Sequence, residues 1–472
     1  MRSPRSIRFV AVRALVLATL ALVTGCSKPP RPEASWIAIP GPEPQASPSA
    51  LAPDILIVLV DTLRPDHLGS YGYGKPTSPY LDRWAQQARR YEYAFTNATH
   101  TRMAVASLFT GARPTVHRVR HVDKLENEET DAQPLVTDGL HEGFITIAES
   151  LRDAGYRTWG FSSNPHITHL LHFNQGFSGW WETSSRDGAD MVAKVVGELD
   201  ARGPLEGDRP LMAYVHFMDV HNPYAPPDPF DKQFAPDVRG KVVFNNGPAD
   251  PSPEDLAWSI GQYDGDIRYF DSLLERLLAR WETAGKRPRS VIILSDHGEE
   301  FMEHGGLGHG TSVFGEQARI ALFIKSQRTV PGRSRSPVQT IDVTRAIYEI
   351  AQVSPPDTVQ GRSLRSWTGP TPIYTESRTG LWSIRCGDLM TIQHLTDSKV
   401  QRVYNLTRDP QERQPGAAFG VTSDAQQQQL RFCFESFGQS DNALADRIGT
   451  PVQVTLGEET RDALKGLGYL GQ

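Results

Sequence analysis

Between residues 54 and 295, the hydrophobic and polar positions alternate between two patterns. Continuous apolar runs are typical of strands buried on both faces of a parallel sheet. They occur at Asp54–Asp61, Tyr156–Ser162, Leu211–Phe217 and Val291–Leu294. Helically spaced apolar residues lie between them, at Pro79–Arg90, Ile145–Ala154, Gly188–Leu199 and Tyr263–Ala284. This alternation predicts an α/β fold with a mainly parallel sheet flanked by helices.

The pattern changes at a boundary that runs from Pro355 to Gly369. Shorter alternating segments follow, at Pro372–Glu376, Trp382–Arg385 and Leu389–His394, and a helical segment closes the chain at Gly457–Leu467. Short alternating runs are typical of a small antiparallel sheet. We therefore expect a main domain over residues 54–365 and a smaller C-terminal α+β subdomain over residues 366–472.

The first 53 residues have a different character. Four arginines lead into the apolar run Ala14–Val23, and Gly25 precedes Cys26. A basic start, a short apolar stretch and a small residue predict a signal peptide over residues 1–25. The residues Val23-Thr24-Gly25-Cys26 resemble a bacterial lipobox, which implies lipidation of Cys26. We expect an exported, membrane-anchored lipoprotein that faces the periplasm or the cell exterior, with a Pro-rich linker over residues 26–53.

Composition narrows the classes of function. The 472 residues are 39% hydrophobic and carry a formal net charge of −6. This balance gives no reason to expect nucleic-acid binding or several membrane spans. Two further cysteines, Cys386 and Cys433, are compatible with either a disulfide or two free thiols.

Candidate chemistry appears where the predicted strands end. Asp61 ends the first strand, Asp219 and His221 follow Leu211–Phe217, and Asp296 and His297 follow Val291–Leu294. In open α/β sheets, ligands bind beyond the carboxyl ends of the strands. Carboxylates and imidazoles that converge there form the pattern of a metal site.

Six further segments carry a family pattern: Asp61–Tyr73, Ser107–Gly111, His216–Tyr224, Ser295–Glu299, Gln360–Leu364 and Leu467–Leu470. Together and in this order they resemble bacterial sulfatase-like proteins of the alkaline phosphatase superfamily. The resemblance implies a mixed α/β catalytic domain, a smaller C-terminal sheet domain, and hydrolysis of a sulfate or phosphate ester.

The resemblance also assigns roles to individual residues. Asp61, Asp296 and His297 would bind one divalent metal ion. Ca²⁺ or Mg²⁺ is expected, and Mn²⁺ or Zn²⁺ is compatible with the imidazole of His297. His221 would contact an oxygen of the ester, and His309 stands where many members carry a lysine that donates to the leaving group. The substrate would be a sulfated or phosphorylated small molecule, glycan or envelope component.

At the position of the nucleophile, the chain departs from the formylglycine sulfatases. Counting back from Thr110-Gly111 places Thr101 there, and Met103, Ala104 and Val105 stand where the maturation motif has Pro, Ser and Arg. Oxidation of Thr would give a ketone instead of an aldehyde. Thr nucleophiles that bind the metal occur among phosphotransferases and phosphodiesterases of the superfamily, so we expect Thr101 to act unmodified, at the start of a helix over residues 102–110.

Further residues and two other functions stay open. His100 and Asn164 are candidate substrate contacts, and Glu299 with Glu300 is expected to be a solvated helix start. The first alternative function is a phosphotransferase that acts on a cell-envelope acceptor. The second is a non-catalytic binding protein that keeps the fold.

Overall fold

The computed structural model describes residues 36–39, 52–120, 136–202, 209–235, 240–241, 251–365, 372–397, 401–415 and 424–466. The predicted signal peptide, the lipidation site Cys26 and most of the linker lie outside these residues. No helix within the described ranges combines the length and the apolar character that a membrane crossing requires.

A nine-stranded sheet forms the centre of the fold, and five neighbouring strands in it are parallel. β2 (Asp54–Val60) lies between β8 (Leu211–Phe217) and β9 (Arg289–Ser295) and pairs in parallel with both. All seven residues of β2 and of β8 are buried, as their apolar runs predict. The order is β1-β7-β6-β8-β2-β9-β12-β3-β13, where β1 is Ile37–Ala38, β7 Gly179–Glu182, β6 Arg157–Ser162, β12 Leu322–Lys325, β3 Arg89–Tyr91 and β13 Gly332–Ser334.

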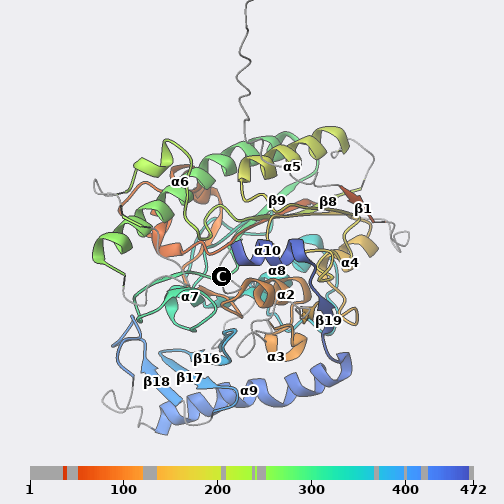
Figure 1. Cartoon of the computed structure of the whole chain (residues 1–472). Coiled ribbons are helices and arrows are strands. Elements are labelled where there is room, and N and C mark those ends of the chain that lie inside the picture. Colours follow the sequence, from red (N-terminus) through yellow and green to blue (C-terminus); the bar gives the residue numbers. More distant parts are fainter. Residues whose placement is uncertain are drawn as a thin grey trace, which may run out of the picture. The chain divides into compact units, whose positions relative to one another are not determined.

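Helices cover both faces of this sheet (Figure 1). α5 (Gly188–Arg202) and α6 (Pro253–Thr283) lie together on one face, and α2 (Thr101–Thr110), α4 (Ile147–Asp153) and α8 (Thr340–Ala351) pack on the other. Phe109 of α2 meets Tyr214 of β8 edge to face, with ring centroids 4.9 Å apart. The structure confirms the predicted α/β class with a mixed, mainly parallel sheet.

Two elements differ from the prediction. The helix expected over Pro79–Arg90 ends earlier, as α1 (Pro79–Trp84), because residues 89–91 form strand β3 between β12 and β13. α6 begins at Pro253, ahead of the predicted start at Tyr263, because the Ser252 side chain accepts from the Asp255 amide and caps this polar first part.

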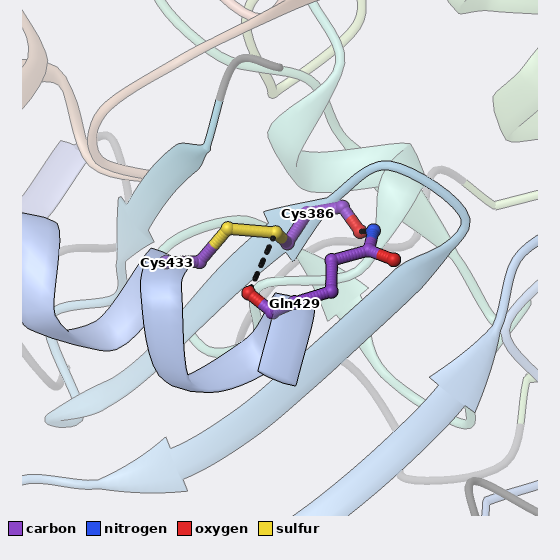
Figure 2. The surroundings of a disulfide bond; sticks show 3 residues. All are labelled: Cys386, Gln429 and Cys433. Carbon is purple, nitrogen blue, oxygen red and sulfur yellow. Dashed lines mark hydrogen bonds between the residues drawn. A yellow bond between two sulfur atoms is a disulfide. The ribbon is translucent and has the colours of Figure 1, made fainter. Parts of the chain in front are cut away.

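The C-terminal residues form a separate antiparallel sheet, as predicted. Its strands are β15 (Ile373–Glu376), β16 (Leu381–Cys386), β17 (Leu389–His394) and β18 (Gln401–Asn405). The helix α9 (Asp424–Ile448), which sequence analysis missed, is joined to β16 by the disulfide Cys386–Cys433. Figure 2 shows the Gln429 side chain beside this disulfide, where its amide donates to the Cys386 carbonyl at 2.6 Å.

The last elements return to the main body. β19 (Val452–Thr455) pairs antiparallel with β5 (Val136–Gly139), and α10 (Glu458–Gly466) adds Leu464 to the main hydrophobic core. The division at residue 365 therefore stays a prediction. The remaining short elements are η1 (Pro65–His67), η2 (Gly69–Tyr71), η3 (Ala85–Gln87), β4 (Ala94–Phe95), α3 (Pro114–His117), η4 (Phe230–Lys232), β10 (Glu300–Phe301), β11 (Leu307–Gly308), α7 (Gly315–Ala318) and β14 (Val338–Gln339).

Candidate active site

The carboxyl edge of the parallel strands gathers the predicted metal ligands. Asp61 directly follows β2, and Asp296 and His297 directly follow β9. Each offers one ligand atom, and these three atoms lie within 4.8 Å of one another. All three side chains are buried. The structure thus places the predicted ligand set in one cluster.

In this cluster, each of the two carboxylates, Asp61 and Asp296, has one oxygen that accepts hydrogen bonds and one that accepts none from the described part of the chain. Asp61 Oδ2 accepts from Asn164 Nδ2 at 2.6 Å and lies 3.2 Å from His216 Nε2. Asp296 Oδ1 accepts the amides of Thr62 at 3.2 Å and His297 at 2.8 Å. Asp61 Oδ1 and Asp296 Oδ2 are buried and have no hydrogen-bond partner among the described residues. Buried oxygens of this kind are costly unless a proton or cation meets them.

The imidazole of His297 is oriented for a ligand role. Its Nδ1 lies 2.9 Å from the Gly298 carbonyl, which can only accept, so Nδ1 carries the proton. The lone pair is therefore on Nε2, which lies 3.3 Å from Asp296 Oδ2 and 3.8 Å from Asp61 Oδ1. Metal-binding histidines are held in this way by a carbonyl on their other nitrogen. The donor set fits one divalent ion.

The two carboxylates have opposite pKa shifts. Burial alone would raise the pKa of Asp61, but the hydrogen bond of His216 and the nearby imidazoles of His221 and His297 outweigh it, and the pKa is lowered. Burial, together with the charge of Asp61, raises the pKa of Asp296. Two like charges so close disfavour full ionisation, and a divalent ion would remove that penalty.

Thr62 holds a strained backbone conformation next to the cluster. Its φ of 58° lies in the left-handed region, which is unusual for a β-branched residue. The Thr62 amide bonds Asp296, and Thr62 Oγ1 donates to the Val220 carbonyl at 3.0 Å. The strain therefore places a backbone donor on Asp296, as is common at functional sites.

Thr101 lies beside the cluster as the first residue of α2. Its Oγ1 is 3.2 Å from His297 Nε2 and 3.5 Å from Asp61 Oδ2. The start of a helix favours negative charge, which suits an anionic substrate there. His100 precedes Thr101, is buried, and packs edge to face on His166 with ring centroids 4.9 Å apart.

His221 and His309 form a second group against the cluster. The His309 ring lies 4.4 Å from that of His297 and 5.0 Å from that of His221. His309 Nδ1 is 2.9 Å from Glu299 Oε1, and the other oxygen of Glu299 accepts from the Tyr224 hydroxyl at 2.9 Å.

The environment gives these two histidines different pKa values. Burial on its own would lower the pKa of His309, but the charge and hydrogen bond of Glu299 raise it above the ordinary value. Burial lowers the pKa of His221 to about 3, although the charge of Asp61 opposes this shift. His309 is therefore the better proton donor of the two.

Some expectations for individual residues change. Glu299 and Glu300 are buried, and they do not form a solvated helix start, because Glu299 bonds His309 and Tyr224 and Glu300 lies in β10. Asp219 is not in the cluster, since its Oδ1 accepts the Gly188 amide at the start of α5. Asn164 bonds Asp61, and the substrate contacts of Asn164 and His100 stay predictions. Sequence analysis missed the site roles of His216 and Glu299.

A buried group of carboxylates and imidazoles at the edge of a mainly parallel sheet, with a hydroxyl beside it, fits a hydrolase of sulfuric or phosphoric esters. The model of the sulfatase family matches residues 53–353, and the chain belongs to this family. Its members generally bind a divalent metal ion.

Relatives and solved structures agree with this membership. The uncharacterized sulfatase YidJ of Escherichia coli (strain K12) is 21% identical over 424 residues, which cover 76% of this chain and 82% of that protein. An arylsulfatase of Clostridium perfringens is 22% identical over 70% of this chain and 80% of its own length. The phosphonate monoester hydrolase of Silicibacter pomeroyi shares the fold with a TM-score of 0.64 at 15% identity, covering 81% of this chain and 95% of its own. A protein solved with its substrate D-glucosamine-2-N,6-O-disulfate has a TM-score of 0.62 at 17% identity, over 84% of this chain and 99% of that chain.

Proposed function

We propose that this protein is a metal-dependent hydrolase that cleaves a sulfate or phosphate ester with the unmodified hydroxyl of Thr101 as nucleophile. The observation that best supports this is the position of Thr101 Oγ1, which lies 3.2 Å from His297 Nε2 and 3.5 Å from Asp61 Oδ2. A nucleophile needs to lie within reach of the groups that activate it.

Asp61, Asp296 and His297 would hold the metal ion. When bound, a divalent ion lowers the pKa of a coordinated hydroxyl and offsets charge on the tetrahedral centre. Ca²⁺ or Mg²⁺ suits the two carboxylates, and Mn²⁺ or Zn²⁺ is compatible with His297. Asn164 and His216 keep Asp61 oriented through Oδ2.

Three residues of the chain have separate roles in the proposed reaction. Thr101 Oγ1 releases its proton to water and attacks the sulfur or phosphorus from the side opposite the leaving oxygen, whose bond breaks as the new bond forms. His309, whose pKa is raised by Glu299, donates a proton to that leaving oxygen. His221 donates from Nδ1 to the Asn222 carbonyl at 2.6 Å, so it can donate to an ester oxygen only when a second proton is bound to Nε2. A water molecule then hydrolyses the Thr101 ester, which releases sulfate or phosphate and restores the hydroxyl.

The names of similar proteins support a proposal for the class of substrate. One neighbour binds a sulfated glucosamine, one relative is named an arylsulfatase, and another neighbour is a phosphonate monoester hydrolase. We propose a sulfated or phosphorylated small molecule, glycan or envelope component as substrate. The disulfide Cys386–Cys433 supports an exported location, because disulfides persist in oxidising compartments.

Substitution of Thr101 tests the proposal. Thr101→Ala should lower turnover on the order of 10³-fold or more, whereas Thr101→Ser should keep part of it. Turnover is measured on aryl sulfates, phosphate mono- and diesters and phosphonates with several metals. Peptide mass spectrometry should find an unmodified Thr101 before substrate and a covalent adduct after it. Full activity in Thr101→Ala would contradict this role and would mean that another side chain or a water molecule is the nucleophile.

A further inference from the structure

A small cavity is lined in part by the loop that carries His221. Its volume is about 260 Å³, and Arg186, Asp187, Asp219, Asp266 and Tyr269 are among the residues that line it. These residues come from the start of α5, from the loop after β8, and from α6. The reaction proposed above uses none of them.

Two carboxylates in this cavity are buried, and each leaves an oxygen without a partner. Asp219 is 7% exposed and Asp266 is 3% exposed. Asp219 Oδ1 accepts the Gly188 amide at 2.9 Å, and Asp266 accepts a hydrogen bond from the backbone of Ala225. Oδ2 of each has no hydrogen-bond partner among the described residues. Buried, unpartnered carboxylate oxygens on two residues that line one cavity require a proton or a cation.

The local charge is negative even after the nearby arginine is counted. The guanidinium of Arg186 donates to the carbonyls of Met218 at 3.3 Å and Pro223 at 3.4 Å, and also to that of His221. Three carboxylates line the cavity with this one guanidinium, because Asp187 joins the two buried aspartates. When ionised they leave two negative charges, which a divalent cation would neutralise.

We infer that Asp219 and Asp266 form a second divalent cation site, separate from the cluster at Asp61. The donors are oxygens only, which favours a hard cation, and the cavity has room for the water ligands that complete a flexible Ca²⁺ shell. A cation bound by both aspartates would link helix α6, through Asp266, to the loop that carries Asp219 and His221. Asp219 also accepts the Gly188 amide at the start of α5. This inference does not depend on the proposed reaction.

Counting Ca²⁺ in variants of the full chain tests the inference. The variant Asp61→Asn with Asp296→Asn removes the first site, is stripped with EDTA, and is then titrated with Ca²⁺ alone. We expect about one Ca²⁺ per chain to bind and to raise the melting temperature. Adding Asp266→Asn, or separately Asp219→Asn, should abolish both effects. Asp200→Asn is the control, since Asp200 is exposed in α5 and is not among the residues that line the cavity, and it should change neither.

The result that overturns the inference is equally plain. No Ca²⁺ uptake at millimolar concentration in the Asp61→Asn, Asp296→Asn variant would mean that the two aspartates share a proton instead. This first measurement leaves the cavity itself unaltered, so it does not depend on how Asp266→Asn folds. Binding that survives both Asp219→Asn and Asp266→Asn in folded protein, checked by circular dichroism, would also reject the site.

Discussion

At the scale of single residues, His309 and His221 show how neighbours shift the pKa of one side chain type in opposite directions. Their rings lie 5.0 Å apart. Glu299 raises the pKa of His309, whereas burial lowers the pKa of His221 to about 3. His309 therefore keeps its proton to a higher pH than His221 does. The two histidines of the site therefore have different tasks.

The leaving group of the substrate reveals this difference. His309→Gln should slow hydrolysis of an alkyl ester by about 10²-fold or more, because a poor leaving group needs the proton. The same variant should slow a nitrophenyl ester far less, since that leaving group departs without help. Values of kcat/KM across a leaving-group series measure the effect. His221→Gln is the control and should slow both esters similarly, and an equal loss for both esters in His309→Gln would contradict the assignment.

The sequence predicts some of these residues and not others, for a physical reason. Asp61 and Asp296 each follow a buried parallel strand, and such strand ends meet at one edge of a sheet. Their meeting was therefore predictable from the apolar runs alone. The partner of His309 was not, because Glu299 comes from a turn whose direction depends on the tertiary fold. Similarly, His216 lies inside a buried strand, so its sequence position indicates only a core residue. Its contact with Asp61 becomes visible only in the folded structure.

At the scale of elements, the β10–β11 hairpin connects the active-site loop to the C-terminal residues through His304. Its Nδ1 lies 2.6 Å from Glu316 Oε1 and its Nε2 lies 3.0 Å from the Glu412 carbonyl. The ring also stacks on Phe314 at 3.7 Å. Burial alone would lower the pKa of His304, but Glu316 raises it above the ordinary value. Burial also raises the pKa of Glu316, but a carboxylic acid ordinarily titrates at a much lower pH than an imidazole. Both side chains are therefore charged at pH values between the pKa of Glu316 and the pKa of His304.

This pair makes stability depend on pH. Because the pKa of His304 is raised in the folded state, the stabilisation is complete below about pH 6.5, the ordinary value for histidine, and is lost as the pH rises through the folded pKa. The melting temperature of the wild type should therefore exceed that of His304→Gln at pH 6 by more than it does at pH 9. His169→Gln removes an exposed histidine that pairs with Glu182 and is the control. A gap that does not vary with pH would contradict this prediction.

Helix α9 is anchored to the main body through Asp441. Arg113 binds this carboxylate with two nitrogens, and Thr115 and Gln360 donate to it at 2.6 and 2.7 Å. Both ends of the Arg113–Asp441 pair are buried. Removing one partner of a buried pair leaves an uncompensated charge.

Asp441→Asn should therefore lower the free energy of unfolding by about 3 kcal/mol. The same helix offers a matched control, because Asp446 makes an ion pair with Arg118 at 2.9 Å but its side chain is 74% exposed. Asp446→Asn should cost less than about 1 kcal/mol. Urea unfolding of the two variants makes the comparison, and equal losses would mean that Asp441 is no more important than a surface charge.

The elements that sequence analysis predicted well are those with apolar runs of their own. β2 and β8 have the predicted bounds to within one residue because every position in them is buried. α9 was not predicted, and contacts with distant residues, the disulfide and the bonds of Asp441, fix its place. Such contacts between distant residues leave no periodic signal along the chain.

At the scale of the whole molecule, the anchor proposed at Cys26 sets where the enzyme works. An acylated N-terminal cysteine would hold the protein stably at a membrane. Cys26→Ser should move the protein from the membrane fraction to the soluble fraction, or block its processing. Fractionation and the mass of the mature protein measure this, and Cys386→Ser, which removes a cysteine of the disulfide and not the one in the predicted lipobox, should leave attachment unchanged. Unaltered attachment and mass in Cys26→Ser would rule out lipidation.

The pairing of β19 with β5 has a consequence for synthesis. Leu456 and Leu464 belong to the same core as Ile55 of the first long strand. While the ribosome is still making the C-terminal part, β5 lacks β19 and this core lacks both leucines. The nascent chain therefore cannot finish folding before almost all of it has been made. For the proposed export as an extended chain, this late closure would keep the chain unfolded until translocation has begun.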